Sequence, residues 1–413
     1  MLLISALIAF AALAVAVPSP SLSPLPPSQD PWYTAPRGYE TTSPGKILRI
    51  RPAPGNLTAI FSNSSAAYNI LYRTTNSHYE PFWAVTTVFV PKRADRSALL
   101  SYQLPYNSAD VDGSVSYLLY DAEAPGNSLL LDDVQAALSN GWYVNVPDYL
   151  GPLTSFGAGV FEGHATLDSI RATKKADIGL HDNTSIALWG YSGGSIGSEW
   201  AAELHSAYAP ELNIVGAAMG GLVSNLSSAI PVVTGTRWAG LLPEVTLGLF
   251  SQYPEAMAYL HSQLHETGTH NASTFLAAAH LNIAEAFTYY ANQDIYAYFA
   301  AGADFFSASV VQNVLKRETY MGFHGIPQMP LFFYHAVHDE LTNVSNPQAL
   351  FDRYCAVGVD VLFERNVVGG HLAEATNGDK RALEWLREVL AGRHEEKGCI
   401  QEAVVLNITD SPL

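Results

Sequence analysis

The sequence predicts an α/β protein: a mainly parallel β-sheet flanked by helices, with a helical insertion between two of its strands. Short apolar stretches alternate with helix-like stretches along most of the chain, as expected when parallel strands are buried on both faces. Residues 222–324 interrupt this alternation, because they contain no convincing strand and read as helices. A Gly-x-Ser-x-Gly sequence also joins one predicted strand directly to a predicted helix.

The chain begins with a segment expected to be removed and an arm expected to be irregular. Residues 1–16 are apolar and end in Ala14-Val15-Ala16, which is typical of a secretory signal peptide, although no Lys or Arg precedes the run. This run is shorter than the roughly 20 residues of a membrane-spanning helix. Residues 17–45 are rich in Pro and Ser, which favours an irregular arm.

The core is expected in two parts, 46–221 and 325–413, on either side of the insertion. The predicted strands are 67–74, 84–90, 98–104, 143–146, 185–189, 214–219, 331–335 and 359–365. The predicted core helices are 128–140, 164–175, 196–205 and 377–391, and those of the insertion are 243–265, 272–291 and 307–320. The insertion would act as a cap or lid if it lay over an active site.

Composition narrows the class of ligand. The 413 residues are 48% hydrophobic and 14% charged, and the formal net charge is −17. Such a chain repels phosphate backbones and anionic lipid headgroups, which argues against nucleic-acid binding and favours a neutral or weakly charged substrate.

Two features agree with export. Cys355 and Cys399 are the only cysteines, and in an oxidising compartment they are expected to form one disulfide. Two buried free thiols are the alternative. Asn-x-Ser/Thr sequences, which can accept glycans, begin at Asn56, Asn63, Asn183, Asn225, Asn271, Asn343 and Asn407.

The Gly-x-Ser-x-Gly sequence consists of Gly190, Tyr191, Ser192, Gly193 and Gly194. A strand before it and a helix after it are the context of a nucleophile elbow in the α/β-hydrolase fold, a tight turn that exposes the serine at the end of a strand. Ser192 is therefore the candidate nucleophile. A second match overlaps the first, but its serine, Ser195, lies too far past the strand and is expected to cap or pack within the helix.

A serine nucleophile needs a base, and the base needs an acid that orients it. In this fold the acid precedes the histidine, and both follow the serine. Asp339 lies in the turn after strand 331–335, and His371 lies in a loop after strand 359–365, which reads as the final strand. These two residues complete the predicted triad.

Other residues compete for these roles. Glu340 is an alternative acid, because it neighbours Asp339. His335 and His338 lie on the acid's own strand or turn and are not expected to face it as a base. A metal site built on His335, His338 and Asp339 is disfavoured, because a third separated ligand is missing; no metal is expected.

An oxyanion hole needs two hydrogen-bond donors. One should be the backbone N–H of Gly193, the residue after the nucleophile. The second should come from the loop after strand 98–104, where Asn107 is the candidate through its backbone N–H and its side-chain amide. The alternative is that Asn107 is an ordinary turn residue.

Together these segments resemble the fungal secretory lipase family, of the Candida antarctica lipase A type. The resemblance rests on 101–108, 141–152, 163–171, the Ser192 turn, the Asp339 turn and 370–372. It implies an α/β-hydrolase core, a helical cap and lid, and hydrolysis of triacylglycerols or other lipophilic esters without a cofactor. A lipid–water interface is an expected place of action, and the sequence gives no sign of an obligate protein partner.

The sequence departs from the family at two places. The family's oxyanion position is usually Asp, and here it is Asn107, whose amide donates at any pH. The family often has a Cys near Gly113 that pairs with one in the cap, and this chain has neither. The sequence favours a secreted lipase, and an esterase that deacylates a secondary metabolite is the alternative. A serine peptidase and a binding protein without catalysis are disfavoured.

Overall fold

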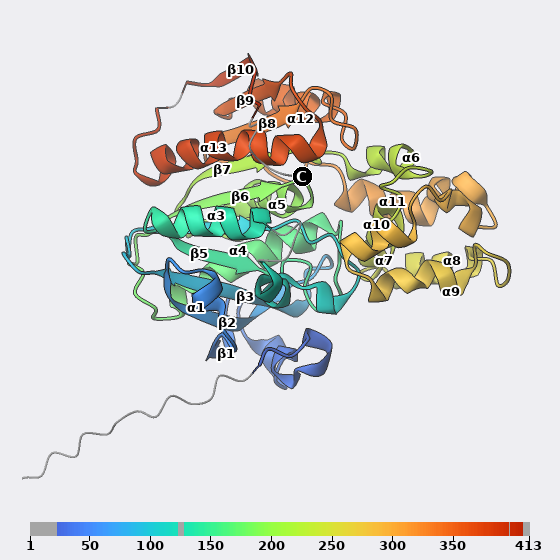
Figure 1. Cartoon of the computed structure of the whole chain (residues 1–413), viewed down its shortest axis with the longest axis horizontal. Helices are drawn as coiled ribbons and strands as arrows, with labels where there is room; N and C mark the ends of the chain where they lie inside the picture. Colours follow the sequence, from blue (N-terminus) through green and yellow to red (C-terminus); the bar gives the residue numbers. More distant parts are fainter. Residues whose placement is uncertain (1–22, 123–127, 396, 408–413) are drawn as a thin grey trace, which may run out of the picture.

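The computed structural model describes residues 23–122, 128–395 and 397–407, and these form a ten-stranded sheet with helices on both faces (Figure 1). The strand order is β1-β2-β3-β5-β4-β6-β7-β8-β9-β10. The strands are β1 (Ile47–Pro52), β2 (Ser64–Thr75), β3 (Pro81–Pro91), β4 (Ala98–Gln103), β5 (Tyr143–Pro147), β6 (Ser185–Tyr191), β7 (Ile214–Gly220), β8 (Leu331–Ala336), β9 (Val361–Asn366) and β10 (Cys399–Val404). Pairing is antiparallel from β1 to β5 and parallel from β5 to β10.

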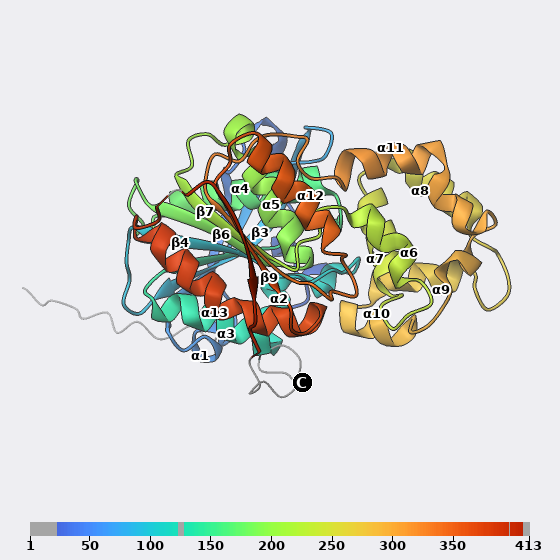
Figure 2. The same cartoon turned by 90° about the horizontal axis from the view of Figure 1, so that it is seen from above.

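Helices cover both faces of this sheet, as Figure 2 shows from above. Helices α4 and α5 pack on one face, and α3 and α13 pack on the other. The helices of the core are α1 (Leu57–Ile60), α2 (Val115–Leu118), α3 (Ser128–Ser139), α4 (Gly159–Lys175), α5 (Gly193–Tyr208), α12 (Ser345–Ala356) and α13 (His371–Leu390). The predicted fold class, a mainly parallel sheet flanked by helices, is confirmed.

The eight predicted strands are all present, but the strands β1 and β10 and the helix α12 were not predicted. β1 and β10 are the outermost strands, and β10 exposes most of its side chains. An exposed edge strand that mixes polar and apolar residues has neither an apolar run nor a clean alternation, so its sequence carries little signal. The expectation that strand 359–365 is the last one is wrong, because β10 follows β9 and pairs with it in parallel.

The insertion between β7 and β8 is helical, and its helices form a lobe at one end of the sheet (Figures 1 and 2). It contains α6 (Ile230–Val233), α7 (Leu241–Phe250), α8 (Pro254–Gln263), α9 (Ala272–Leu276), α10 (Ile283–Tyr289) and α11 (Ser309–Glu318). The predicted helix 243–265 is two helices, because Pro254 starts a helix and cannot continue one. The predicted helix 272–291 is also divided, because the side chain of Asn282 caps the first turn of α10.

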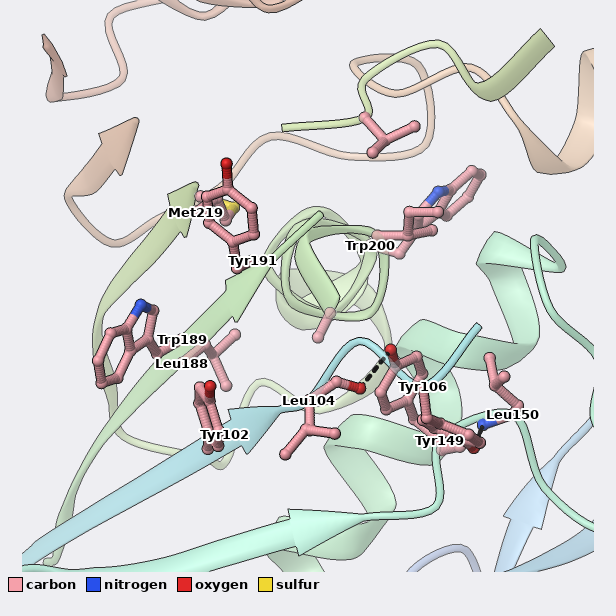
Figure 3. Packing of buried hydrophobic residues seen from close by; sticks show 14 of the residues in the cluster. Tyr102, Leu104, Tyr106, Tyr149, Leu150, Leu188, Trp189, Tyr191, Trp200 and Met219 are labelled. Carbon is pink, nitrogen blue, oxygen red and sulfur yellow. Dashed lines mark hydrogen bonds between the residues drawn. The ribbon is translucent and has the colours of Figure 1, made fainter. Parts of the chain in front are cut away.

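Aromatic side chains fill the core below the carboxyl ends of the central strands (Figure 3). Trp189 on β6 is buried and donates a hydrogen bond from Nε1 to the hydroxyl of Tyr334 on β8, at 2.9 Å. Tyr149 is also buried and donates to the carbonyl of Leu104, just past β4, at 2.9 Å. Buried and satisfied polar groups of this kind fix the strands relative to one another. The ends of β4, β6 and β8 are therefore a rigid platform.

The two ends of the described chain are attached to the fold in different ways. The described part of the N-terminal arm has only short 3₁₀ turns, and the carbonyl of Tyr33 accepts a hydrogen bond from the Trp83 indole at 3.0 Å. The predicted disulfide between Cys355 and Cys399 is present and links α12 to β10. Residues 1–16, predicted as a signal peptide, lie outside the described residues. Within the described ranges, no helix is long and apolar enough to cross a membrane.

Candidate active site

The Ser192 turn has the strained geometry that its sequence predicts. Ser192 lies between the end of β6 and the start of α5, with φ 51° and ψ −122°, a conformation that non-glycine residues rarely adopt. A Cβ atom at Gly190 would lie 2.1 Å from the carbonyl oxygen of Gly194, and one at Gly194 would lie 1.8 Å from that of Gln103. Only glycine fits these two positions, so the turn requires both glycines.

The structure brings the three residues of the predicted triad into one chain of hydrogen bonds. Nε2 of His371 lies 2.7 Å from Oγ of Ser192, and Nδ1 lies 2.7 Å from Oδ2 of Asp339. The second oxygen of Asp339 accepts from the backbone N–H groups of Leu341 and Thr342, both at 2.8 Å. The serine follows β6, the aspartate follows β8 and the histidine follows β9. This is the arrangement in which a serine can be deprotonated as it attacks.

The backbone of His371 is held as firmly as its ring. Its N–H donates to Oε2 of Glu340 at 2.8 Å, and its carbonyl accepts from the Tyr191 hydroxyl at 2.5 Å. Glu340, the alternative acid, thus contacts the backbone of His371 and not the imidazole. His371 is the first residue of α13, so the expectation that it lies in a loop is wrong. Helix α13 begins earlier than the predicted 377.

The environment of Asp339 favours its charged form. Burial alone would raise the pKa of Asp339, but the His371 hydrogen bond, the two nearby histidines and the Thr342 N–H outweigh it, and the pKa is lowered. One of these histidines is His335, whose Nε2 lies 3.5 Å from Oδ2 of Asp339 and 2.9 Å from the carbonyl of Thr342. His335 thus lies beside the acid, but its hydrogen bond goes to Thr342, and the imidazole that is hydrogen-bonded to Asp339 is that of His371. Burial lowers the pKa of His335.

Asn107 and Gly193, the predicted oxyanion donors, lie against each other. A Cβ atom at Gly193 would be 1.8 Å from Oδ1 of Asn107. Asn107 has φ 42°, in the left-handed region, and its Oδ1 is buried without a hydrogen-bond partner among the described residues. Rotation of the amide by half a turn would present Nδ2, a donor, in place of Oδ1. Both residues line the same pocket as Ser192 and His371.

That pocket is lined largely by apolar side chains of the insertion. Its apolar walls include Leu226, Ile230, Val233, Leu241, Leu242 and Val245. A second, smaller cavity lies further into the insertion and shares Leu226, Ile230 and Val245 with the first. These three side chains, called the dividing wall below, separate the two spaces. Reasoning from the sequence did not identify them, because apolar residues on short helices look like ordinary core.

The remaining sequence candidates lie outside the pocket. Oγ of Ser195 donates to the carbonyl of Ser192 at 2.5 Å and accepts from Val223 N at 3.1 Å, so this hydroxyl packs within the structure. The described residues contain no group of three His, Cys, Asp or Glu side chains placed to hold a metal ion.

The seven glycosylation sequences differ in exposure. Asn56, Asn183, Asn343 and Asn407 are exposed, whereas Asn63, Asn225 and Asn271 are partly buried. In two of the partly buried asparagines the side-chain amide nitrogen donates a hydrogen bond within the protein. Nδ2 of Asn63 donates to Ser139 Oγ at 2.7 Å, and Nδ2 of Asn271 donates to the carbonyl of Gly268 at 2.6 Å.

Sequence comparisons show that this chain is similar to known ester hydrolases. The sequence model of the secretory lipase family matches residues 128–398. Trichothecene C-3 esterase of Fusarium sporotrichioides is 47% identical over 95% of this chain and 91% of its own length. Lipase A of Arthroderma benhamiae is 35% identical over 94% of this chain and 84% of its own length.

The structural comparison agrees. The X-ray structure of Candida antarctica lipase A in its closed state superposes with a TM-score of 0.84 at 26% identity, covering 92% of this chain and 89% of that one.

Proposed function

We propose that this chain, which belongs to the secretory lipase family and is a carboxylic ester hydrolase, cleaves its ester through Ser192, His371 and Asp339. The observation that supports this most strongly is the continuous hydrogen-bond chain from Ser192 Oγ through the imidazole to Asp339. In the proposed cycle His371 takes the serine proton as Oγ attacks the ester carbonyl, and Asp339 stabilises the imidazolium. His371 then gives the proton to the leaving alcohol, and water repeats the sequence to release the acid.

The developing oxyanion needs donors that point at it before the reaction begins. The N–H of Gly193 opens α5, and helix N-termini favour negative charge. Asn107, which packs on Gly193, is proposed as the second donor. Residues 222–324 are proposed as a cap, since α6 and α7 supply five of the apolar side chains that line the pocket around Ser192.

For the substrate we propose a short-chain acyl ester of a bulky alcohol of the trichothecene class. Two relatives support this choice: the C-3 esterase at 47% identity and a protein named Probable trichothecene esterase of Stachybotrys chartarum at 44%. The dividing wall supports the short acyl chain, because it closes the first pocket before the second cavity begins. A triacylglycerol lipase is the second candidate, favoured by the apolar lining of the pocket and by the lipases at 35% identity or less.

The test is a substrate series with wild type and Ser192→Ala in parallel. It comprises p-nitrophenyl esters from acetate to palmitate, emulsified triolein, and a trichothecene acetylated at the C-3 hydroxyl. The proposal predicts that the acetylated trichothecene and short p-nitrophenyl esters give the highest kcat/KM, and that Ser192→Ala abolishes both. Higher kcat/KM on palmitate and triolein would select the lipase instead. Hydrolysis that survives Ser192→Ala would overturn the mechanism.

Secretion is proposed to follow removal of residues 1–16, with glycans on the exposed Asn56, Asn183, Asn343 and Asn407. The family is a secretory one, and a disulfide links Cys355 and Cys399. Amino-terminal sequencing of protein from the culture medium should begin at Val17. Peptide mapping after endoglycosidase treatment should show modification at the four exposed sites.

A further inference from the structure

A buried carboxyl of the insertion contacts the loop that carries Asn107. Glu244, on α7, is fully buried, and its Oε2 accepts a hydrogen bond of 2.5 Å from the backbone N–H of Ala109. Ala109 lies two residues after Asn107. Leu242 and Val245, on the same helix, line the substrate pocket. One helix of the insertion therefore contributes both to the wall above Ser192 and to the support of this loop.

The loop needs support because of its backbone conformation. Asn107 has φ 42°, and a non-glycine residue in the left-handed region is strained unless its surroundings hold it. Two further hydrogen bonds hold this segment. Oγ of Ser108 donates to the carbonyl of Leu281 in the insertion at 3.0 Å, and Oγ1 of Thr154 donates to the carbonyl of Ala109 at 2.7 Å. Two of the three contacts thus come from the insertion.

Packing alone does not explain a carboxyl at position 244. Burying a polar group costs free energy that an apolar residue of similar size would avoid. Oε1 of Glu244 has no hydrogen-bond partner among the described residues, so the bond from Ala109 is the contact that uses the carboxyl. Burial raises the pKa of Glu244 to about 9, so the group is neutral near pH 7 and accepts from Ala109 without a buried charge.

We infer that Glu244 is a positioning residue of the oxyanion hole, which holds Asn107 against Gly193 through the N–H of Ala109 while the insertion is seated on the core. This inference rests on the proposed function, since it takes Asn107 as an oxyanion donor. The carboxyl does not reach the reacting atoms. It acts through the loop, and it couples the position of α7 to the geometry of the hole.

The insertion offers a matched control in Glu318. This residue, on α11, is also a fully buried glutamate of the insertion that accepts from a core backbone N–H, that of Val160, at 2.9 Å. It also accepts from the hydroxyl of Tyr253. Removing its carboxyl weakens the seating of the insertion without touching the loop from Asn107 to Ala109. Glu244→Ala and Glu318→Ala therefore separate positioning of the loop from general docking.

The experiment measures kcat and KM for p-nitrophenyl acetate with four proteins: wild type, Glu244→Ala, Glu244→Gln and Glu318→Ala. We expect Glu244→Ala to lower kcat about 10- to 100-fold with little change in KM, less than the loss of an oxyanion donor itself. Glu244→Gln keeps a neutral acceptor and should stay within about threefold of wild type. Glu318→Ala should keep its kcat within about threefold while its Tm falls.

Two results would overturn the inference: Glu244→Ala with an unchanged kcat, or a loss of kcat in Glu318→Ala as large as that in Glu244→Ala. If Glu244→Ala does not fold, Glu244→Asp replaces it, because a carboxyl shorter by one methylene does not reach Ala109. Failure of the proposed function is distinct, since it appears as hydrolysis that survives Ser192→Ala. A dead Ser192→Ala beside a fully active Glu244→Ala contradicts this inference alone.

Discussion

The core and the insertion supply different things to the same pocket. The core supplies Ser192, Asp339 and His371 from the ends of strands, joined by 2.7 Å hydrogen bonds. The insertion supplies short helices, such as the four-residue α6, whose side chains at the pocket are apolar. Under the proposed function, residues at the ends of strands carry out the chemistry, and side chains on short helices select the substrate. Substitutions in the triad should lower kcat for every ester, and those of the apolar insertion residues that line the pocket should change which ester is preferred.

The largest effect is expected from the acid of the triad. Asp339→Asn should lower kcat about 10⁴-fold on every substrate, because the amide holds the imidazole in the wrong tautomer. Glu340→Gln is the control, since it keeps an acceptor for the backbone N–H of His371. Its loss should be below about tenfold. Steady-state kinetics with p-nitrophenyl acetate would measure kcat for both variants. A greater loss of kcat in Glu340→Gln than in Asp339→Asn would identify Glu340 as the acid of the triad.

A smaller loss of kcat is expected when Asn107, which also lies in the core, is replaced. Asn107→Ala should lower kcat about 10²- to 10³-fold, with KM nearly unchanged, because an oxyanion donor acts mainly in the transition state. The loss should be the same factor for acetate and octanoate esters. Full activity in this variant would mean that Asn107 is only a turn residue.

A substitution in the dividing wall should change which acyl chain is preferred and leave the catalytic residues intact. Val245→Ala joins the two cavities, so the octanoate-to-acetate ratio of kcat/KM should rise about tenfold or more. Val233→Ala is matched in chemistry, but Val233 lines only the first pocket and not the second cavity. Its ratio should stay near that of wild type. Equal shifts in both variants would show that pocket size in general, and not the wall, sets acyl length.

The smallest effect concerns pH and stability. The pKa of Glu244 is raised to about 9 by burial, with Asp110 adding to the shift; Tyr290 is a further ionisable neighbour. The folded protein therefore binds a proton that the unfolded chain releases near pH 4.5, and this group lowers stability as pH rises from there towards 9. Glu244→Gln removes that slope, at most about 1.4 kcal/mol per pH unit. Urea unfolding at pH 5.5 and pH 8 gives the free energy of unfolding of wild type and Glu244→Gln. If the difference between the two proteins is the same at both pH values, the pKa of Glu244 is not raised.

The sequence predicted the core better than the insertion, for physical reasons. Ser192 was identifiable because a tight turn between a strand and a helix demands glycine at Gly190 and Gly194, which leaves a motif. Asp339 and His371 were identifiable because the order of the elements places both after strands at the same edge of the sheet. The prediction that His371 lies in a loop failed, because its first-turn position in α13 depends on tertiary contacts from Glu340 and Tyr191.

The insertion was predicted only as helices. Apolar residues at Ile230 and Val245 look the same in sequence whether they line a pocket or pack in a core, so the dividing wall left no pattern. Glu244 is the one ionisable residue of α7, and its partner Ala109 lies far away in the chain. Contacts between distant segments through single backbone groups carry no periodicity that a sequence can show.

The proposed mechanism requires Ser192 as the nucleophile, and covalent labelling can identify that residue directly. Wild-type protein treated with a fluorophosphonate ester should lose hydrolysis and gain one label, which proteolysis and mass spectrometry should place on Ser192 and not on Ser195 in the same peptide. Ser192→Ala should take up no label. A label on Ser195, or complete inhibition with Ser192 unmodified, would exclude Ser192 as the nucleophile.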